Sequence, residues 1–170
     1  MSLDEFAALK ARLQALEDRA AILDTLQNYG HALDYGNVEQ LVNCFTDDAV
    51  RETWRPDGTV NRWAGTEGTR EFAMTHSHAP DKYHKHLVLN SVVELHGDTA
   101  DAVSYMFRFD AGEGEKSYVW GMGRYVDRMR RDPDGQWRIQ RRVTYIEDQW
   151  PGRSRPATGL VTAASTNSQT

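Results

Sequence analysis

The segment Tyr83–Asn90, with the sequence YHKHLVLN, places two histidines and an asparagine inside a hydrophobic run. Side chains of a β-strand alternate between the two faces of a sheet. His84, His86 and Asn90 therefore share one face of the strand that this segment predicts. Imidazole and amide groups among Leu and Val indicate either a solvated face or a cavity that requires polar groups. An imidazole near neutral pH can act as a general base or as a metal ligand.

Asp34 is the candidate partner for His86. It follows Leu33 at the end of an apolar helical stripe, so we expect its carboxylate to point inward and to need a buried partner. A carboxylate beside an imidazole fixes the tautomer and supports proton abstraction. His31 is the rival partner, three residues before Asp34 on the same helical face. Both residues could instead have purely structural roles: Asp34 could be a solvated aspartate in a turn, and His86 could be a hydrogen-bonded histidine of the core.

Metal binding is a second chemistry that the histidines allow. The pairs His76-x-His78 and His84-x-His86 could each share one ion, because imidazoles two apart on a strand point the same way. A proline follows the first pair, and the only cysteine, Cys44, lies among apolar residues as expected for a buried, inert thiol. We therefore expect no metal and no cofactor, with His84 at the rim of a pocket.

The composition is that of an ordinary folded domain. A chain of 170 residues with 39% hydrophobic and 26% charged residues can bury one substantial core. The net charge of −5 offers no basic surface for nucleic acid. The chain shows neither an apolar leader nor an apolar run of about 18 residues, so we expect a cytoplasmic protein without a membrane span.

Helices come first along the chain. Apolar residues three and four apart predict a long helix over the first 35 residues, ended by Gly36. Shorter helices are predicted at 38–45 and 66–76. Two short strands flank a turn at 55–58, between the second and third helices.

Strands fill the rest of the chain. Four long segments rich in β-branched and aromatic residues are joined by turn signals and predict an antiparallel meander: 82–95, 99–110, 116–131 and 136–150. Helices followed by a sheet are typical of an α+β domain. We expect this domain to span 1–150, with a flexible tail at 151–170. Strict alternation on the last strand places Arg142 on the face of Arg138 and Gln140, opposite Trp137 and Ile139.

Three segments together resemble the SnoaL-like branch of the nuclear-transport-factor-2-like (NTF2-like) superfamily: LQNYGHALDYGNVEQLVNCFTDDAV, HLVLNSVVELHGDTADAVSYM and GRYVDRMRRDPDGQWRIQRRV. The resemblance runs from about Ala20 to Trp150. It implies a cone, in which a strongly bent antiparallel sheet wraps three helices and leaves an apolar pocket. Members include scytalone and bile-acid dehydratases, a dehydrochlorinase, polyketide cyclases and noncatalytic subunits of dioxygenases.

The resemblance also implies catalytic residues. It places the family's Asp–His pair on Asp34 and His86, its helix tyrosine on Tyr29 and the arginine of its last strand on Arg142. Tyr29 and Asp34 lie five residues apart, about 140° around a helix that turns ~100° per residue. They can line one pocket only if the cavity is wide or the helix loosens near Gly30. An ordinary core tyrosine and a salt-bridged outer arginine are the alternatives for Tyr29 and Arg142.

The remaining candidates concern substrate binding. Trp54, Met106 and Trp120 are expected to form apolar pocket walls, as is Trp63, although each could simply belong to the core. Asn90 is expected to support His86 by a hydrogen bond. The dehydratases carry one further acidic residue on the strand at 105–110, where Phe107 and Phe109 occupy the expected positions.

These residues predict a cofactor-free lyase or isomerase that performs dehydratase-type elimination on a small apolar ring compound. His86, paired with Asp34, would remove a proton from an activated carbon. Tyr29 would donate to the departing hydroxyl or to an oxyanion, and Arg142 would stabilise negative charge. The alternatives are an aldol-type polyketide cyclase with the same base, and a noncatalytic ligand carrier or assembly subunit that does not need the Asp–His pair.

Self-association is the last prediction from the sequence. The helical seam from Phe6 to Leu23 has more apolar positions than one small cone can cover, and Tyr118, Trp120 and Met122 could add an outer sheet patch. The dehydratases that the chain resembles are trimers packed through the sheet. We therefore expect a homotrimer, with a dimer as the alternative.

Overall fold

The computed structural model describes residues 1–111 and 117–149, and the predicted tail at 151–170 lies outside these described residues. It contains three helices in its described part: α1 (Leu3–Asp34), α2 (Val38–Asn43) and α3 (Gly65–Met74). The strands are β1 (Phe45–Trp54), β2 (Val60–Ala64), β3 (His84–His96), β4 (Thr99–Asp110), β5 (Tyr118–Arg131) and β6 (Trp137–Gln149). The predicted α+β class is confirmed.

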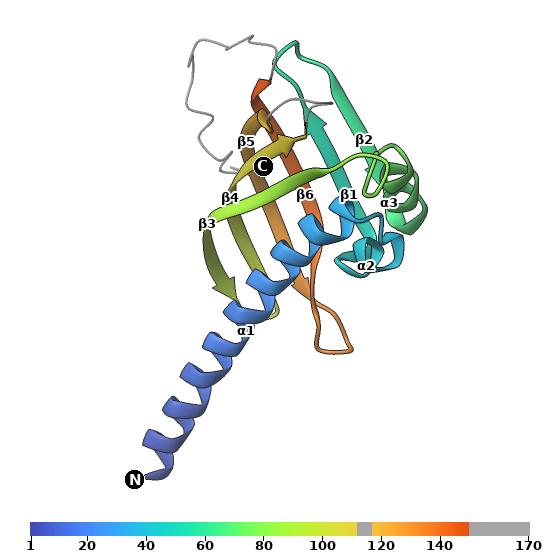
Figure 1. Ribbon diagram of the computed structural model, residues 1–170. Coiled ribbons are helices and arrows are strands. Elements are labelled where there is room, and N and C mark those ends of the chain that lie inside the picture. Colours follow the sequence, from blue (N-terminus) through green and yellow to red (C-terminus); the bar gives the residue numbers. More distant parts are fainter. Residues whose placement is uncertain (112–116, 150–170) are drawn as a thin grey trace, which may run out of the picture.

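The strands form one sheet in the order β2-β1-β6-β5-β4-β3. β1 and β6 are parallel, and the other neighbouring pairs are antiparallel, so the predicted meander of the last four strands is confirmed. The sheet curls around the C-terminal half of α1, and α2 and α3 lie beside β1 and β2 (Figure 1). The concave side of this curl is where the candidate site is found.

The core lies between α1 and the concave face of the sheet. Ile22 and Leu26 of α1 are fully buried and pack in one cluster with Met129 and Ile139 of the sheet. Burying an aliphatic side chain of this size contributes roughly 1.5–3 kcal/mol. Cys44 belongs to the same cluster, and burial raises the pKa of its thiol to about 11, as expected for an inert cysteine.

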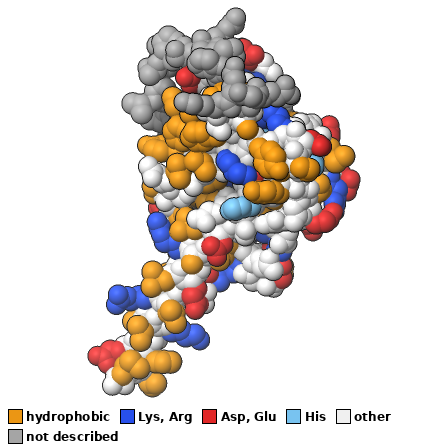
Figure 2. Space-filling view, in the orientation of Figure 1, with side chains coloured by type: hydrophobic (Ala, Val, Ile, Leu, Met, Phe, Trp, Pro, Cys, Tyr) orange, Lys and Arg blue, Asp and Glu red, His pale blue; other side chains and the backbone are white. Residues whose placement is uncertain are grey.

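The N-terminal half of α1 projects away from the sheet (Figures 1 and 2). Asp18 marks the point of departure, because its carboxylate accepts hydrogen bonds from Arg131 Nη2 at 2.6 Å and from Trp137 Nε1 at 3.1 Å. Every residue from 1 to 17 is exposed. The projecting apolar side chains are each more than half exposed: Leu3, Phe6, Leu9, Leu13 and Leu16. No helix in the described ranges is both long and apolar enough to cross a membrane.

A bulge in β6 reverses the predicted orientation of Arg142. The pairing between β5 and β6 skips Gln140, so this strand carries one extra residue there. Ile139 before the bulge and Arg142 after it are both fully buried, whereas Arg141 is exposed. The prediction that Arg142 lies opposite Ile139 was therefore wrong, because the extra residue shifts the alternation by one.

Candidate active site

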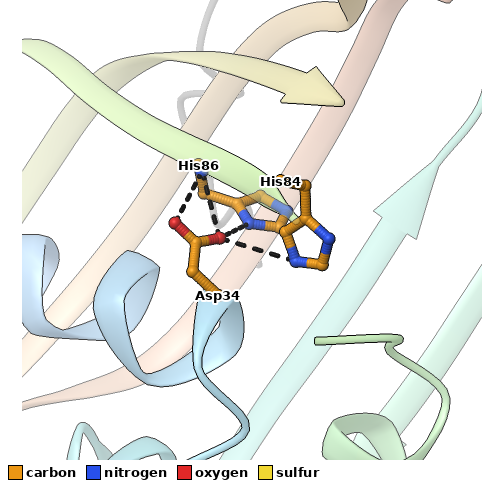
Figure 3. Close-up of side chains that lie close together, drawn as sticks. All are labelled: Asp34, His84 and His86. Atoms are coloured by element: carbon orange, nitrogen blue, oxygen red, sulfur yellow. Dashed lines mark hydrogen bonds and ion pairs between the residues drawn. The ribbon is translucent and has the colours of Figure 1, made fainter. Parts of the chain in front are cut away.

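Asp34 and His86 meet where the end of α1 reaches β3. His86 Nδ1 lies 2.8 Å from Asp34 Oδ1, and the backbone N–H of His86 donates to both carboxylate oxygens at 3.2 Å (Figure 3). Asp34 is only 3% exposed. The carboxylate is thus fixed by one residue through three contacts, and the imidazole ring is held in a single orientation. His31, the rival partner, is exposed.

The contact with Asp34 determines the state of the His86 ring. Nδ1–H donates to the Asp34 carboxylate, so Nε2 carries the free lone pair. Burial lowers the pKa of His86, while the hydrogen bond to Asp34 acts in the opposite direction. His86 is therefore a neutral imidazole at neutral pH, as a general base must be.

His84 lies behind this pair and not at a pocket rim. It is 2% exposed, its Nε2 lies 3.5 Å from Asp34 Oδ1, and its ring meets the His86 ring edge-on at 5.1 Å. Burial lowers the pKa of His84 to about 4, so this ring is also neutral. The predicted rim position was wrong, because β3 enters the core already at its first residue.

Asp34, His84 and His86 form the candidate metal cluster of the described chain. One donor atom from each lies within 4.8 Å of the others. Nδ1 of His86 would have to give up its proton and its bond to Asp34 before it could bind an ion. The other histidine pair does not converge: His76 faces His86 at 6.0 Å between rings, whereas His78 bonds the Ala79 carbonyl.

A cavity of about 470 Å³ opens beside His86 on the concave side of the sheet. Its apolar walls are Trp63, Phe72, Met106, Trp120 and Ile146. Tyr29 also lines it, whereas Asp34 lies outside the lining, behind the His86 ring. The 140° between Tyr29 and Asp34 on α1 therefore needs no distortion of the helix, because only Tyr29 contacts the cavity. A ring-sized molecule fits a cavity of this size.

Two predicted binding residues lie away from the cavity. Trp54 is 44% exposed and packs against Tyr145 at 5.9 Å between rings. Asn90 is exposed, with φ at 51°, in a stretch of β3 where the pairing with β4 is irregular. Both predictions were wrong. For Asn90 the reason is this bulge, which interrupts the alternation that should have placed it beside His86.

The profile of the SnoaL-like domain family matches residues 14–143. The chain belongs to the SnoaL-like domain family. This family includes polyketide cyclases and dehydratases. No curated protein matches the chain.

Solved structures share the fold of the chain. An NTF2-like protein with a cystatin-like fold from Novosphingobium aromaticivorans is 26% identical, with a TM-score of 0.75 over 86% of this chain and 93% of that one. A function-unknown protein of Mycobacterium tuberculosis is 29% identical, with a TM-score of 0.67 over 79% and 73%. A protein of N. aromaticivorans provisionally named scytalone dehydratase shares the fold at 18% identity, with a TM-score of 0.67 over 88% and 97%.

Arg142 of this SnoaL-like domain lies one layer behind the cavity. Its Nε and Nη2 each donate to Asp127 at 2.8 Å, and its guanidinium carbon lies 4.1 Å from the ring centroids of both Tyr29 and Tyr125. It is fully buried and is absent from the cavity lining. The predicted arginine is thus close to the site, but it reaches the cavity only through the two tyrosines.

Several residues that line the cavity of this SnoaL-like domain were not predicted as pocket residues, among them Arg51, His76 and Arg108. Arg51 alternates with Thr53 on the buried face of β1, and this alternation was the signal that could have found it. Arg108 follows Met106 by two on β4, so the inward positions there are not those of Phe107 and Phe109. Burial, assisted by Arg51, lowers the pKa of His76 to about 3.

Proposed function

We propose that this SnoaL-like protein is a cofactor-free lyase or isomerase that performs dehydratase-type elimination on a small apolar ring compound. The observation that carries the proposal is His86, a neutral imidazole that lines the cavity while its Nδ1–H is held by Asp34. Family membership supports it, since SnoaL-like proteins include dehydratases.

His86 Nε2 takes a proton from a ring carbon made acidic by a neighbouring carbonyl. The electron pair of the broken C–H bond forms a C=C bond as the hydroxyl leaves, and the Tyr29 hydroxyl supplies the proton that converts it to water. Transfer of the proton from His86 back to the Tyr29 phenolate restores the enzyme. Each positioned acid or base contributes on the order of 10²–10⁴-fold.

Arg142 is a positioning residue in this scheme. Its guanidinium contacts the Tyr29 ring face at 4.1 Å and favours the phenolate that forms during turnover. Asp127 holds it in place through two hydrogen bonds. In this proposal Arg142 stabilises negative charge through Tyr29, without touching the substrate.

The test is turnover of hydroxylated and halogenated ring compounds by the purified protein, with products identified by mass spectrometry. Loss of water or of halide supports elimination. A product of unchanged mass with a new C–C bond would support the aldol-type cyclase, which uses the same base. Binding without turnover across the panel would contradict an enzyme and support the noncatalytic carrier.

We also propose that the protein is cytoplasmic and assembles as a homotrimer, with a dimer as the alternative. The exposed apolar positions on the projecting half of α1 support self-association. The convex face of the sheet adds further exposed apolar residues: Leu87, Leu89, Val103, Tyr105 and Met122. Trp120, which was also considered for this outer patch, lines the cavity.

A further inference from the structure

The cavity beside His86 is positively charged. Its lining includes three arginines, Arg51, Arg55 and Arg108, and among the described residues that line it there is no aspartate or glutamate. An apolar ring alone would not need these charges. The three arginines differ in the partners that they have within the protein.

Two of the three arginines are engaged within the protein. Arg108 donates to the two oxygens of Asp110 at 2.6 and 3.1 Å, and its guanidinium lies over the Trp120 ring at 4.5 Å. Arg55 donates to the amide oxygen of Asn61. Arg108 is therefore paired with a carboxylate, and Arg55, which is only half-buried, has a hydrogen-bond partner.

Arg51 differs from both. It is 5% exposed, and its Nε and Nη1 are buried with no hydrogen-bond partner within the described part of the chain. No carboxylate in that part of the chain forms an ion pair with it; its guanidinium is stacked instead on the Phe72 ring at 3.2 Å from the centroid. Burial of a cation without a counter-charge is strongly unfavourable.

The neighbouring strand shows how such a charge is normally compensated. Arg142 of β6 is in register with Arg51 of β1, and it is paired through two hydrogen bonds with the buried Asp127. Among the described residues, one carboxylate is thus available beside two adjacent buried guanidinium groups, and it is bonded to Arg142. The charge that remains is on Arg51, which is the one of the two that lines the cavity.

Thr144 provides a second unsatisfied group at the same place. Its Oγ1 is buried without a hydrogen-bond partner among the described residues, and the residue lines the cavity. Thr144 is in register with Thr53, which follows Arg51 by two on the same buried face of β1. Unpaired donors therefore lie on two adjacent strands, two register positions apart, and both residues line the same cavity.

We propose that Arg51 binds a carboxylate of the substrate, with Thr144 as a second hydrogen-bond donor, so that the ligand is an apolar ring carboxylic acid bound as its anion. A permanent anion compensates the Arg51 charge in the bound ground state, which a neutral ring compound does not. The ring lies against the apolar walls, and the carboxylate fixes which ring carbon faces His86. The proposed elimination is what makes this ligand a substrate; the binding itself does not depend on it.

The experiment compares the affinities of the purified protein for 2-naphthoate and for its neutral isostere 2-naphthamide by titration calorimetry at pH 7.5. We expect the carboxylate to bind at least about tenfold more tightly, as for a desolvated charge pair. Arg51→Met should reduce this preference to about twofold or less while 2-naphthamide affinity is retained, which shows that the cavity is intact. Arg51→Lys keeps the charge and should keep most of the preference.

Arg55→Met is the matched control, since it removes another lining arginine that already has a partner, and its carboxylate preference should equal that of the wild type. Equal affinity of the wild-type protein for the two probes, no binding of either, or a preference that survives in Arg51→Met would overturn the proposal. His86→Ala separates it from the proposed reaction. That variant should keep the preference for 2-naphthoate over 2-naphthamide even though it lacks the proposed base. A failure of the proposed elimination would therefore leave this binding result unchanged.

Discussion

Gly30 of α1 lies against the backbone of His86: a Cβ atom at position 30 would be 2.9 Å from the His86 carbonyl oxygen. This close approach brings the end of the helix to β3, so that Asp34, four residues later, reaches His86 Nδ1. Glycine in a helix interior is less stable than alanine by about 1 kcal/mol. Glycine at this position therefore lowers the stability of the helix but allows α1 to approach the backbone of His86.

Gly30→Ala should separate these two effects. Helix propensity alone predicts a small gain in stability, but the added methyl group must push α1 away from β3. We expect a lower melting temperature and at least about tenfold lower turnover, because small displacements of catalytic groups strongly reduce the reaction rate. Gln27→Ala, at an exposed position of the same helix, is the control and should change neither. A more stable Gly30→Ala protein with full activity would contradict the contact.

The Asp34–His86 pair should behave as a unit. His86→Ala and Asp34→Asn are each expected to reduce turnover by at least ~10²-fold with the fold retained by circular dichroism. The double variant should be scarcely worse than either single one. His31→Ala, which removes an exposed histidine from the last turn of the same helix, serves as the control. Near-wild-type turnover in either single variant would show that the pair is not catalytic.

The pH dependence of turnover should report His86. Burial lowers the pKa of this imidazole from 6.5, and the nearby Arg108 and Arg51 act in the same direction. The basic, active form therefore predominates at and above pH 6.5, and activity falls as the pH drops through the lowered pKa. We expect the acid limb of kcat/KM to have its midpoint below 6.5, with NMR titration of the ring giving the same value. A midpoint above 6.5 would mean that a different group is the base.

Metal removal should leave turnover unchanged. The three donor atoms of Asp34, His84 and His86 are close enough to share an ion, so the alternative has to be tested directly. We expect elemental analysis to find less than about one tenth of an ion per chain, and activity to survive dialysis against a chelator. Stoichiometric zinc or iron that is lost in His84→Ala together with activity would replace the base mechanism by a Lewis-acid mechanism.

The mass in solution should exceed that of one chain. We expect light scattering at micromolar concentration to give a trimer, or alternatively a dimer, because the projecting half of α1 exposes a row of apolar side chains. Leu9→Glu combined with Leu13→Glu should reduce the mass. Lys10→Glu, an exposed charge change between them, should not. A monomeric wild-type protein would remove the explanation for these exposed residues.

Periodicity was sufficient to predict the elements and the order of the meander. The long helix ends one residue before its predicted end, at Asp34, and the four last strands start and stop within a few residues of the predicted ranges. These features depend on local patterns of apolar residues and on turn residues, which are written directly in the sequence.

Predictions of which face a residue occupies failed where a strand carries an extra residue. Asn90 lies at the irregularity in β3, and Arg142 lies two residues after the bulge at Gln140. A bulge depends on how two strands pair, so alternation within one strand does not reveal it. Arg51 was missed for another reason: a buried arginine without a counter-charge is rare enough that a surface position is the default expectation.

Because the charge on Arg51 is uncompensated, the stability of the protein should report the binding of an anion. An anion that neutralises this guanidinium removes a folding penalty, so the melting temperature of the protein should rise more with such a ligand than contact area alone would give. Compound collections can then be ranked by thermal shift before any reaction is known. The unpaired guanidinium of Arg51 thereby allows candidate ligands to be identified from protein stability alone.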